Sequence, residues 1–358
     1  MEPFLYHVHG MGRFDFSSMQ PDDLLPLDAL AAERGQEILP TVFLRREALP
    51  GLVDLLKQYD ALRAEGQLTR IAGFAVEGPL LGPEGGVPQA GKWTPREDEW
   101  RALAELGDLG LRYLVMAPDS LDLHDRVGPG LDFADLLELF YDHGCRVALG
   151  HFGHHDPETS ARRTRELIAH LHSVYEPSPH LVLTDHLFND MPRRFTHAWR
   201  TPQERMHRPA QLAEFLAHDW ETSDLDDLLG PVPATLLRAT RDGLVTPCLN
   251  FDGLHVDLEV CRRTVEYLGA DRLIALTDHI EVDAMAGEAL LLDADGLWRR
   301  KDGIVAAGST DYAGQRANIL ATGFDESVVA ALFDTVPRAA IGYRPRRRPA
   351  PSGNGAAR

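Results

Sequence analysis

Eight short apolar runs alternate with longer helix-like segments along this 358-residue chain. The runs cover residues 4–8, 37–43, 70–76, 111–116, 146–149, 181–183, 245–250 and 273–276. Strands that alternate with helices in this way form a parallel sheet covered by crossover helices. Eight strands favour a closed (β/α)8 TIM barrel, although a doubly wound open sheet has the same alternation because strand closure leaves no mark in the sequence.

The segments between the runs have helical patterns. They cover residues 22–34, 49–65, 95–106, 131–143, 157–172 and 257–268, and several open with Asp or Pro in the first turn. With 44% hydrophobic residues, a chain of this length can bury one large core, so we expect a single barrel domain over residues 1–343. The Arg- and Pro-rich segment 344–358 lacks apolar periodicity, and we expect it to be a disordered tail.

Composition narrows the class of protein. Cys145, Cys248 and Cys261 are widely spaced and odd in number, so they form neither a CxxC metal motif nor a closed disulfide set, and a reducing cytoplasm is the expected setting. The N-terminus has no basic segment followed by a long apolar one, and no apolar run approaches a membrane span. A formal charge of −19 argues against a nucleic-acid partner and leaves a small molecule as the expected one.

Several of the apolar runs end in residues that bind metals. In the first run, His7 and His9 are two positions apart, so on a strand they share one face and can reach a single ion from inside a barrel. Glu77, His151 and His186 each follow a separate run, where a lone buried charge would be costly. These three residues would leave a coordination position open for water, as catalytic zinc sites require. The alternative for Glu77 alone is a strand-end capping group.

Two further residues at strand ends have open interpretations. Asp278 follows the last run and could accept a proton from an activated water, but it could equally cap the next helix. His255 could bind substrate or occupy a packed turn. His154 and His155 lie on a loop that approaches a helix, and we expect them to be solvated rather than to bind metal.

Two connections are longer than is usual between strands and helices, and long loops in compact domains often bind substrates. The first spans residues 78–94 and is rich in Gly and Pro. The second spans residues 189 to about 233 and carries several arginines, among them Arg200, Arg205 and Arg208. We expect substrate contacts from both loops.

Seven short motifs, in order, resemble those of the N-acetylglucosamine-6-phosphate deacetylases of the amidohydrolase superfamily. EGPLL at 77–81 is similar to the family's EGPF, APD at 117–119 to APE, and LGH at 149–151 to GH. TDHLFNDM at 184–191 is similar to THLFNAM, with Asp185 inserted and Asp190 in place of Ala. DGLHV at 252–256, LTD at 276–278 and AGST at 307–310 complete the series. Ordered agreement of this kind is more specific than any single motif.

The resemblance implies a metal-dependent TIM-barrel hydrolase that cleaves an acetamide. It implies that Glu77, His151 and His186 bind the principal ion and that Asp278 is the acid/base. His7 and His9 match an HxH that binds a second ion in some members, while Asn189 and His255 match substrate-contact positions. We expect one or two divalent ions, zinc first, with iron, manganese or cobalt as alternatives.

The sequence also departs from the family. We do not expect the family's small β-sandwich in this chain. Without it, apolar barrel surface would be exposed, and we therefore predict a homodimer that covers this surface. Where the family has KGAH, this sequence has AGKW at 90–93. The family's phosphate-binding segment REPG has no clear counterpart, so Arg200, Arg205 and Arg208 are only loose candidates for phosphate contacts. We expect deacetylation of an N-acetylated amino sugar, with or without a 6-phosphate. The alternatives are hydrolysis of another amide, a lactam or an ester, or a catalytically silent sugar- or metal-binding protein.

Overall fold

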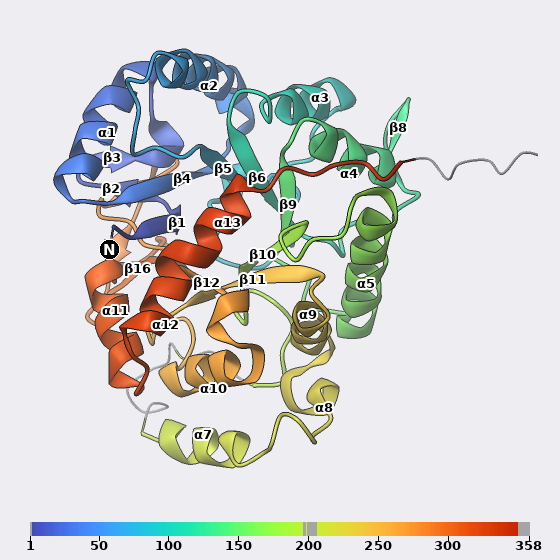
Figure 1. Cartoon of the computed structure of the whole chain (residues 1–358), viewed down its shortest axis with the longest axis vertical. Helices are drawn as coiled ribbons and strands as arrows, with labels where there is room; N and C mark the ends of the chain where they lie inside the picture. The colour runs from blue at the N-terminus through green and yellow to red at the C-terminus, as the bar shows by residue number, and fades with distance from the viewer. Residues whose placement is uncertain (1, 196–197, 199–205, 350–358) are drawn as a thin grey trace, which may run out of the picture.

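The computed structural model describes residues 2–195, 198 and 206–349, and it shows a (β/α)8 barrel (Figure 1). Eight parallel strands follow one another in chain order around a single sheet. They are β1 (Phe4–Val8), β4 (Glu37–Phe43), β5 (Phe74–Glu77), β6 (Leu111–Met116), β9 (Arg146–Leu149), β10 (Val182–His186), β11 (Val245–Asn250) and β12 (Ile274–Leu276). The predicted fold class is therefore confirmed.

The sheet is closed by contacts between its first and last strands. Just after β12, the backbone N–H of Asp278 donates to the carbonyl of His7 at 3.0 Å, and the N–H of His9 donates to the carbonyl of His279 at 3.0 Å. These bonds tie the carboxyl end of β12 to that of β1. The carboxyl ends of all eight strands consequently surround one opening, which is where active sites of such barrels lie.

The helices form a layer around the strands, as Figure 1 shows. They are α1 (Leu24–Glu33), α2 (Leu49–Ala64), α3 (Glu97–Glu105), α4 (Phe133–Asp142), α5 (Pro157–Val174), α7 (Arg208–Leu216), α8 (Leu225–Leu229), α9 (Pro231–Arg241), α10 (Leu258–Leu268), α11 (Tyr312–Ala321), α12 (Glu326–Ala330) and α13 (Val336–Gly342). The predicted helices agree to within two residues at most ends. In α4, for example, Phe133, Leu137 and Phe140 are buried on one face, and Asp132 caps the first turn.

The barrel interior is packed with side chains from the strands. Tyr6, Tyr113 and Leu183 belong to this inner cluster, together with Val336 and Ala340 of α13. The guanidinium of Arg338 lies 5.4 Å above the ring of Phe4, where β1 begins. α13 therefore covers the amino end of the barrel, opposite the carboxyl-end opening.

Outside the barrel, the strands in the described part of the chain form only sheets of two or three strands. They are β2 (Gly10–Met11), β3 (Phe14–Asp15), β7 (Arg126–Gly128), β8 (Leu131–Asp132), β13 (Ala284–Met285), β14 (Glu288–Ala289), β15 (Leu291–Leu292), β16 (Leu297–Arg299) and β17 (Val305–Gly308). Each of these sheets is small compared with the eight-stranded barrel. The sheet of β15–β17 borders the cavity described below, through Arg299 and Val305.

The segment predicted as a disordered tail begins against the outside of the barrel. Arg347 forms ion pairs with Asp142 at 2.6 Å and with Glu138 at 2.7 Å, and the N–H of Arg348 donates to the carbonyl of Val174 at 2.8 Å. These contacts hold the start of the segment beside α4 and α5. Residues 350–358 lie outside the described residues, so disorder there stays a prediction.

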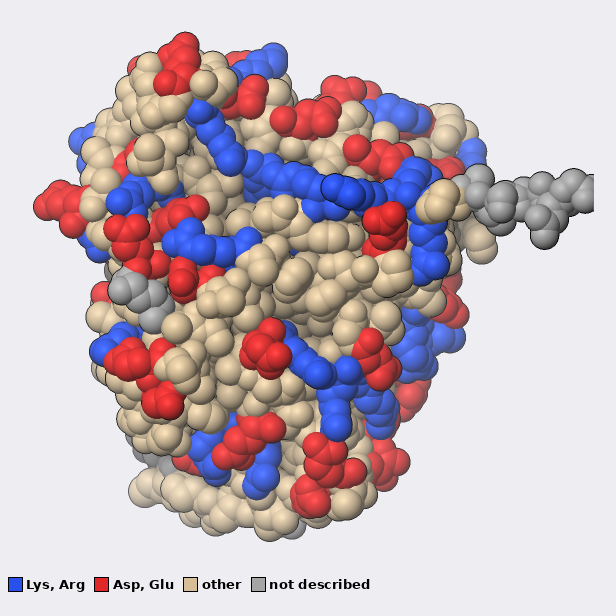
Figure 2. Space-filling model, viewed as in Figure 1, with Lys and Arg blue, Asp and Glu red and all other residues tan. Residues whose placement is uncertain are grey.

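The formal charge of −19 is not spread evenly. Figure 2 shows a row of Lys and Arg side chains across one face of the molecule. Burial, together with the charges of Arg112, Arg146 and Arg63, lowers the pKa of Arg344 to about 10.

In the residues that the structure describes, no helix has the length and apolar character needed to cross a lipid bilayer.

Candidate metal centre

Five barrel strands bring six polar side chains to the carboxyl-end opening, and each is at most 4% exposed. They are His7 from β1, His9 just after β1, Glu77 from β5, His151 after β9, His186 from β10 and Asp278 after β12. These are the ligand and acid/base residues that the sequence suggested. Their side chains converge because parallel strands of a barrel end at the same rim.

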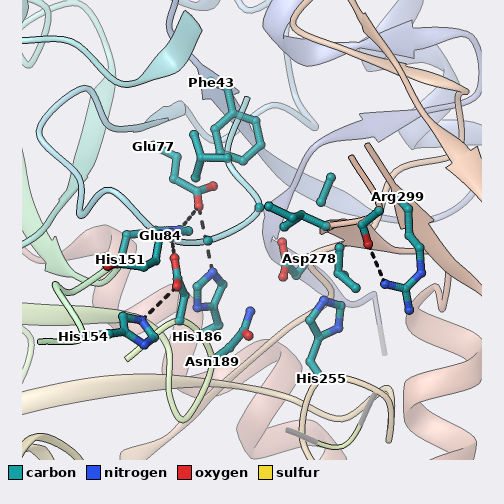
Figure 3. Close-up of a pocket in the computed structure, with 18 residues that line it drawn as sticks. Phe43, Glu77, Glu84, His151, His154, His186, Asn189, His255, Asp278 and Arg299 are labelled. Carbon is teal, nitrogen blue, oxygen red and sulfur yellow. Dashed lines mark hydrogen bonds and ion pairs between the residues drawn. The ribbon is translucent and has the colours of Figure 1, made fainter. Parts of the chain in front are cut away.

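Glu77 lies between two groups of imidazoles. Its Oε2 atom is 3.3 Å from Nε2 of His7 and 3.4 Å from Nε2 of His9. Its Oε1 atom faces Nε2 of His151 and lies 3.9 Å from Nε2 of His186 (Figure 3). Two candidate ligand groups therefore share this carboxylate: one holds Glu77, His151, Asp185 and His186, and the other holds His7, His9 and Glu77.

The backbone is bent at two of these positions. His151 has a φ of 51° and Asp278 a φ of 49°, both in the left-handed region that L-residues seldom adopt. Such conformations cluster at functional sites, where the surrounding structure holds them in place. At Asp278, the bend accompanies a carboxylate that lies 3.1 Å from Nε2 of His9.

Opposite charges dominate the electrostatics of the centre. Burial alone would lower the pKa of His7, but Asp185 and Glu77 raise it to about 9. Burial and Asp185 would raise the pKa of Glu77, but His151 and His7 lower it to about 2. The buried carboxylates thus require positive charge nearby, which protonated imidazoles supply in this state and which a divalent cation would supply in their place.

A cavity of about 390 Å³ opens above the two ligand groups. Asn189 and His255, the predicted substrate-contact residues, line it, and Nδ1 of His255 lies 2.5 Å from Oδ2 of Asp252. The long loop after β5 contributes Glu84 and Val87 to the wall. The loop thus borders the cavity, and its contact with a substrate stays a prediction.

Of the three arginines proposed for phosphate contacts, only Arg208 lies within the described residues, and it does not line this cavity. Arg208 is ion-paired with Asp257 and lines a separate pocket beside Phe195 and Leu212. Arg208 is thus already paired and is not among the residues that line the cavity, so a phosphate contact by Arg208 stays a prediction. Arg200 and Arg205 lie outside the described residues.

Sequence reasoning missed several residues at the site. Asp185 and Asp190 are buried carboxylates within it, and Arg299 from β16 lines the cavity. His154, expected to be solvated, has Nε2 at 3.1 Å from Oδ1 of Asp190 and also lines the cavity. The sequence did contain a sign of Asp185 and Asp190, because they are the two positions at which TDHLFNDM departs from the family's THLFNAM.

No protein-family model and no curated protein matches this sequence. Solved structures do match. An N-acetylglucosamine-6-phosphate deacetylase from Pasteurella multocida has a TM-score of 0.68 and 17% identity, over 95% of this chain and 76% of that one. Similar enzymes from Thermotoga maritima (TM-score 0.66, 16% identity) and Mycobacterium smegmatis (0.65, 20%) match over 95% of this chain and 78% of theirs. The predicted resemblance to these deacetylases is thus confirmed in the fold, which this chain shares with them.

Proposed function

We propose that this chain is a metal-dependent amidohydrolase that hydrolyses the amide of an N-acetylated amino sugar to the free amine and acetate. The observation that carries the proposal is Glu77, shared between two groups of buried imidazoles beneath a cavity at the carboxyl end of the barrel. The fold likeness to deacetylases supports the acetamide as the bond attacked.

The donor atoms fit one or two divalent ions. Oε2 of Glu77, both carboxylate oxygens of Asp185 and Nδ1 of His186 are buried without a hydrogen-bond partner among the described residues. Buried polar atoms left in this way are costly unless a ligand completes them. Imidazole nitrogens combined with carboxylate oxygens suit zinc first, and also iron, manganese or cobalt.

The reaction needs a polarised carbonyl and an activated water, and a divalent ion supplies both when bound. Asp278 is the proton carrier in this proposal: its carboxylate faces the centre, takes the proton of the attacking water and delivers it to the departing amine. Burial would raise the pKa of Asp278, but the hydrogen bond with His9 and the nearby imidazoles lower it. The residue is consequently ionised and ready to accept a proton at neutral pH.

His255 and Asn189 are proposed to hold the sugar. Lys92 and Trp93, which replace the last two residues of the family's KGAH, are engaged elsewhere: Trp93 donates to the carbonyl of Leu44 at 2.7 Å and Lys92 to that of Pro83 at 3.1 Å. Arg299 is the one Lys or Arg among the described residues that line the cavity. Although Arg299 also forms an ion pair with Asp293 at 2.6 Å, its place in the cavity wall makes it our candidate contact for a 6-phosphate.

The testing experiment is a screen of N-acetyl sugars, with and without a 6-phosphate, against protein loaded separately with zinc, manganese, iron and cobalt. We expect acetate release that a chelator abolishes and the added metal restores. Arg299→Gln should raise KM for a phosphorylated substrate and leave KM for its unphosphorylated counterpart unchanged. Absence of turnover with every metal and every N-acyl substrate would overturn the proposal, and retained sugar binding would then favour a binding protein.

A further inference from the structure

Strand β10 contains an extra residue next to the metal centre. Leu183 pairs with Thr246 and His186 with Cys248, so three steps along β10 match two along β11. A β-bulge of this kind changes the direction of side chains that would otherwise alternate between two faces. The consecutive residues Asp185 and His186 accordingly reach the same centre, with Oδ2 of Asp185 at 3.2 Å from Nε2 of His186.

The neighbouring strand makes room for this carboxylate. A Cβ atom added to Gly150, which follows β9, would lie 2.5 Å from Cβ of Asp185 and 3.0 Å from its Oδ2. Real side chains do not approach so closely, so the position of Asp185 depends on glycine at 150. The bulge and this glycine together build a place for Asp185.

The hydrogen bonding of Asp185 is incomplete for a buried carboxylate. It is 2% exposed, and neither of its oxygens has a hydrogen-bond partner in the described part of the chain. Its close polar neighbours are imidazoles: Oδ2 lies 3.2 Å from Nε2 of His151, and Oδ1 lies 3.4 Å from Nδ1 of His7. A buried carboxylate that accepts no hydrogen bond is unfavourable unless a cation compensates it.

The distances around Oδ2 match those between ligands of one ion. The ligand atoms of Glu77, His151, Asp185 and His186 all lie within 4.8 Å of one another. A tetrahedral zinc ion with bonds of about 2.0–2.1 Å separates its ligand atoms by about 3.4 Å. The separations of Asp185 Oδ2 from the two imidazole nitrogens, 3.2 Å each, are close to that value.

We infer that Asp185 is a fourth protein ligand of the ion proposed for Glu77, His151 and His186; the inference rests on the proposed metal centre. His151 and His186 line the substrate cavity, whereas Asp185 is not among its described lining residues. Asp185 thus completes the side of the site away from the cavity, and a water bound from the cavity side would be a fifth ligand. Together with Glu77 and Asp278, it brings three negative charges to face the four positive charges of two divalent ions.

The test measures zinc binding, without any substrate, in wild type and Asp185→Asn. Asparagine keeps the shape but loses the charge that makes the oxygen a good ligand. Zinc affinity is measured by competition with a chromogenic chelator, and we expect the Kd of the tightest zinc site to rise at least about 100-fold in Asp185→Asn. Loss of a residue that only supports a ligand weakens metal affinity by at most about that much. Asp28→Asn is the matched control, because Asp28 is a buried carboxylate that accepts backbone N–H bonds from Thr69 and Arg70, and its zinc affinity should not change.

A second variant reports ligation directly and does not depend on Asp185→Asn being folded. Asp185→Cys loaded with cobalt should show a thiolate-to-cobalt charge-transfer band that cobalt-loaded wild type lacks. Unchanged zinc affinity in Asp185→Asn, or absence of the band in folded, cobalt-loaded Asp185→Cys, would overturn the inference while leaving the metal centre intact. Failure of wild type to bind any of these ions would instead remove the proposed centre itself, and the inference with it.

Discussion

Oδ2 of Asp190 lies 2.5 Å from Nδ1 of His151, whose Nε2 faces Glu77. A carboxylate on the far nitrogen of a metal-binding histidine fixes the ring orientation and makes the near nitrogen a better ligand. We predict that Asp190→Asn weakens metal affinity by about 10–100-fold with the fold intact, measured by chelator competition and circular dichroism. Unchanged metal affinity would mean that Asp190 only packs against the loop that follows β5.

Gly85, in the loop after β5, allows the contact between Asp190 and His151 to be tested without changing a residue of the metal centre. A Cβ at Gly85 would lie 1.8 Å from Oδ2 of Asp190, so Gly85→Ala should displace Asp190 and reproduce the loss of metal affinity. Gly66→Ala is the matched control, because Gly66 has a similar positive φ of 73° but nothing near its Cβ position. Gly66→Ala imposes the same kind of backbone strain as Gly85→Ala but displaces no side chain, so it should retain full metal affinity.

The histidines beneath the cavity can be separated by elemental analysis. His186→Ala should lose the ion assigned to Glu77, His151 and His186, whereas His255→Ala, which alters the wall of the same cavity outside both ligand groups, should keep it. Equal metal content in the two folded variants would show that His186 is not a ligand.

Much of this centre could be predicted from the sequence because its residues end apolar strands. The i, i+2 spacing of His7 and His9, and the positions of Glu77, His151 and Asp278 within two residues of the ends of such runs, depend only on local pattern. The direction of Asp185 could not be predicted in this way, since it depends on the bulge that pairing with β11 creates. The same holds for Arg208, whose partner Asp257 comes from a distant part of the chain.

The raised pKa of His7 predicts that metal binding depends on pH. With a pKa of about 9 in the metal-free protein, His7 is protonated at pH 7, and it must lose that proton before its nitrogen can bind an ion. Affinity should therefore rise between pH 6 and pH 9, by about tenfold per pH unit for each proton released, and this contribution should end above pH 9. Titration calorimetry in buffers of different ionisation enthalpy measures the protons released; release of none at pH 7 contradicts the prediction.

The homodimer predicted from the sequence now has a specific surface to test. Leu291 and Leu292 on β15 are 65% and 52% exposed, and Ile304, just before β17, is 42% exposed. Exposed apolar side chains gathered on one sheet favour association. Light scattering should give twice the chain mass of 39.7 kDa, and combining Leu291→Glu with Leu292→Glu should halve it, whereas Leu25→Glu on α1 should not. A mass of 39.7 kDa for wild type at all concentrations would remove the prediction.

Asp278→Asn separates chemistry from binding. Asparagine tolerates the left-handed backbone at this position, where φ is 49°, so the fold and most of the bound metal should be retained. The amide cannot carry a proton between water and leaving amine, and we expect kcat to fall by about 10²–10⁴-fold with a smaller change in KM. Turnover should be followed by acetate release in metal-replete protein. Comparable kcat in wild type and Asp278→Asn would remove the proposed acid/base role and leave Asp278 as a residue that only shapes the end of β12.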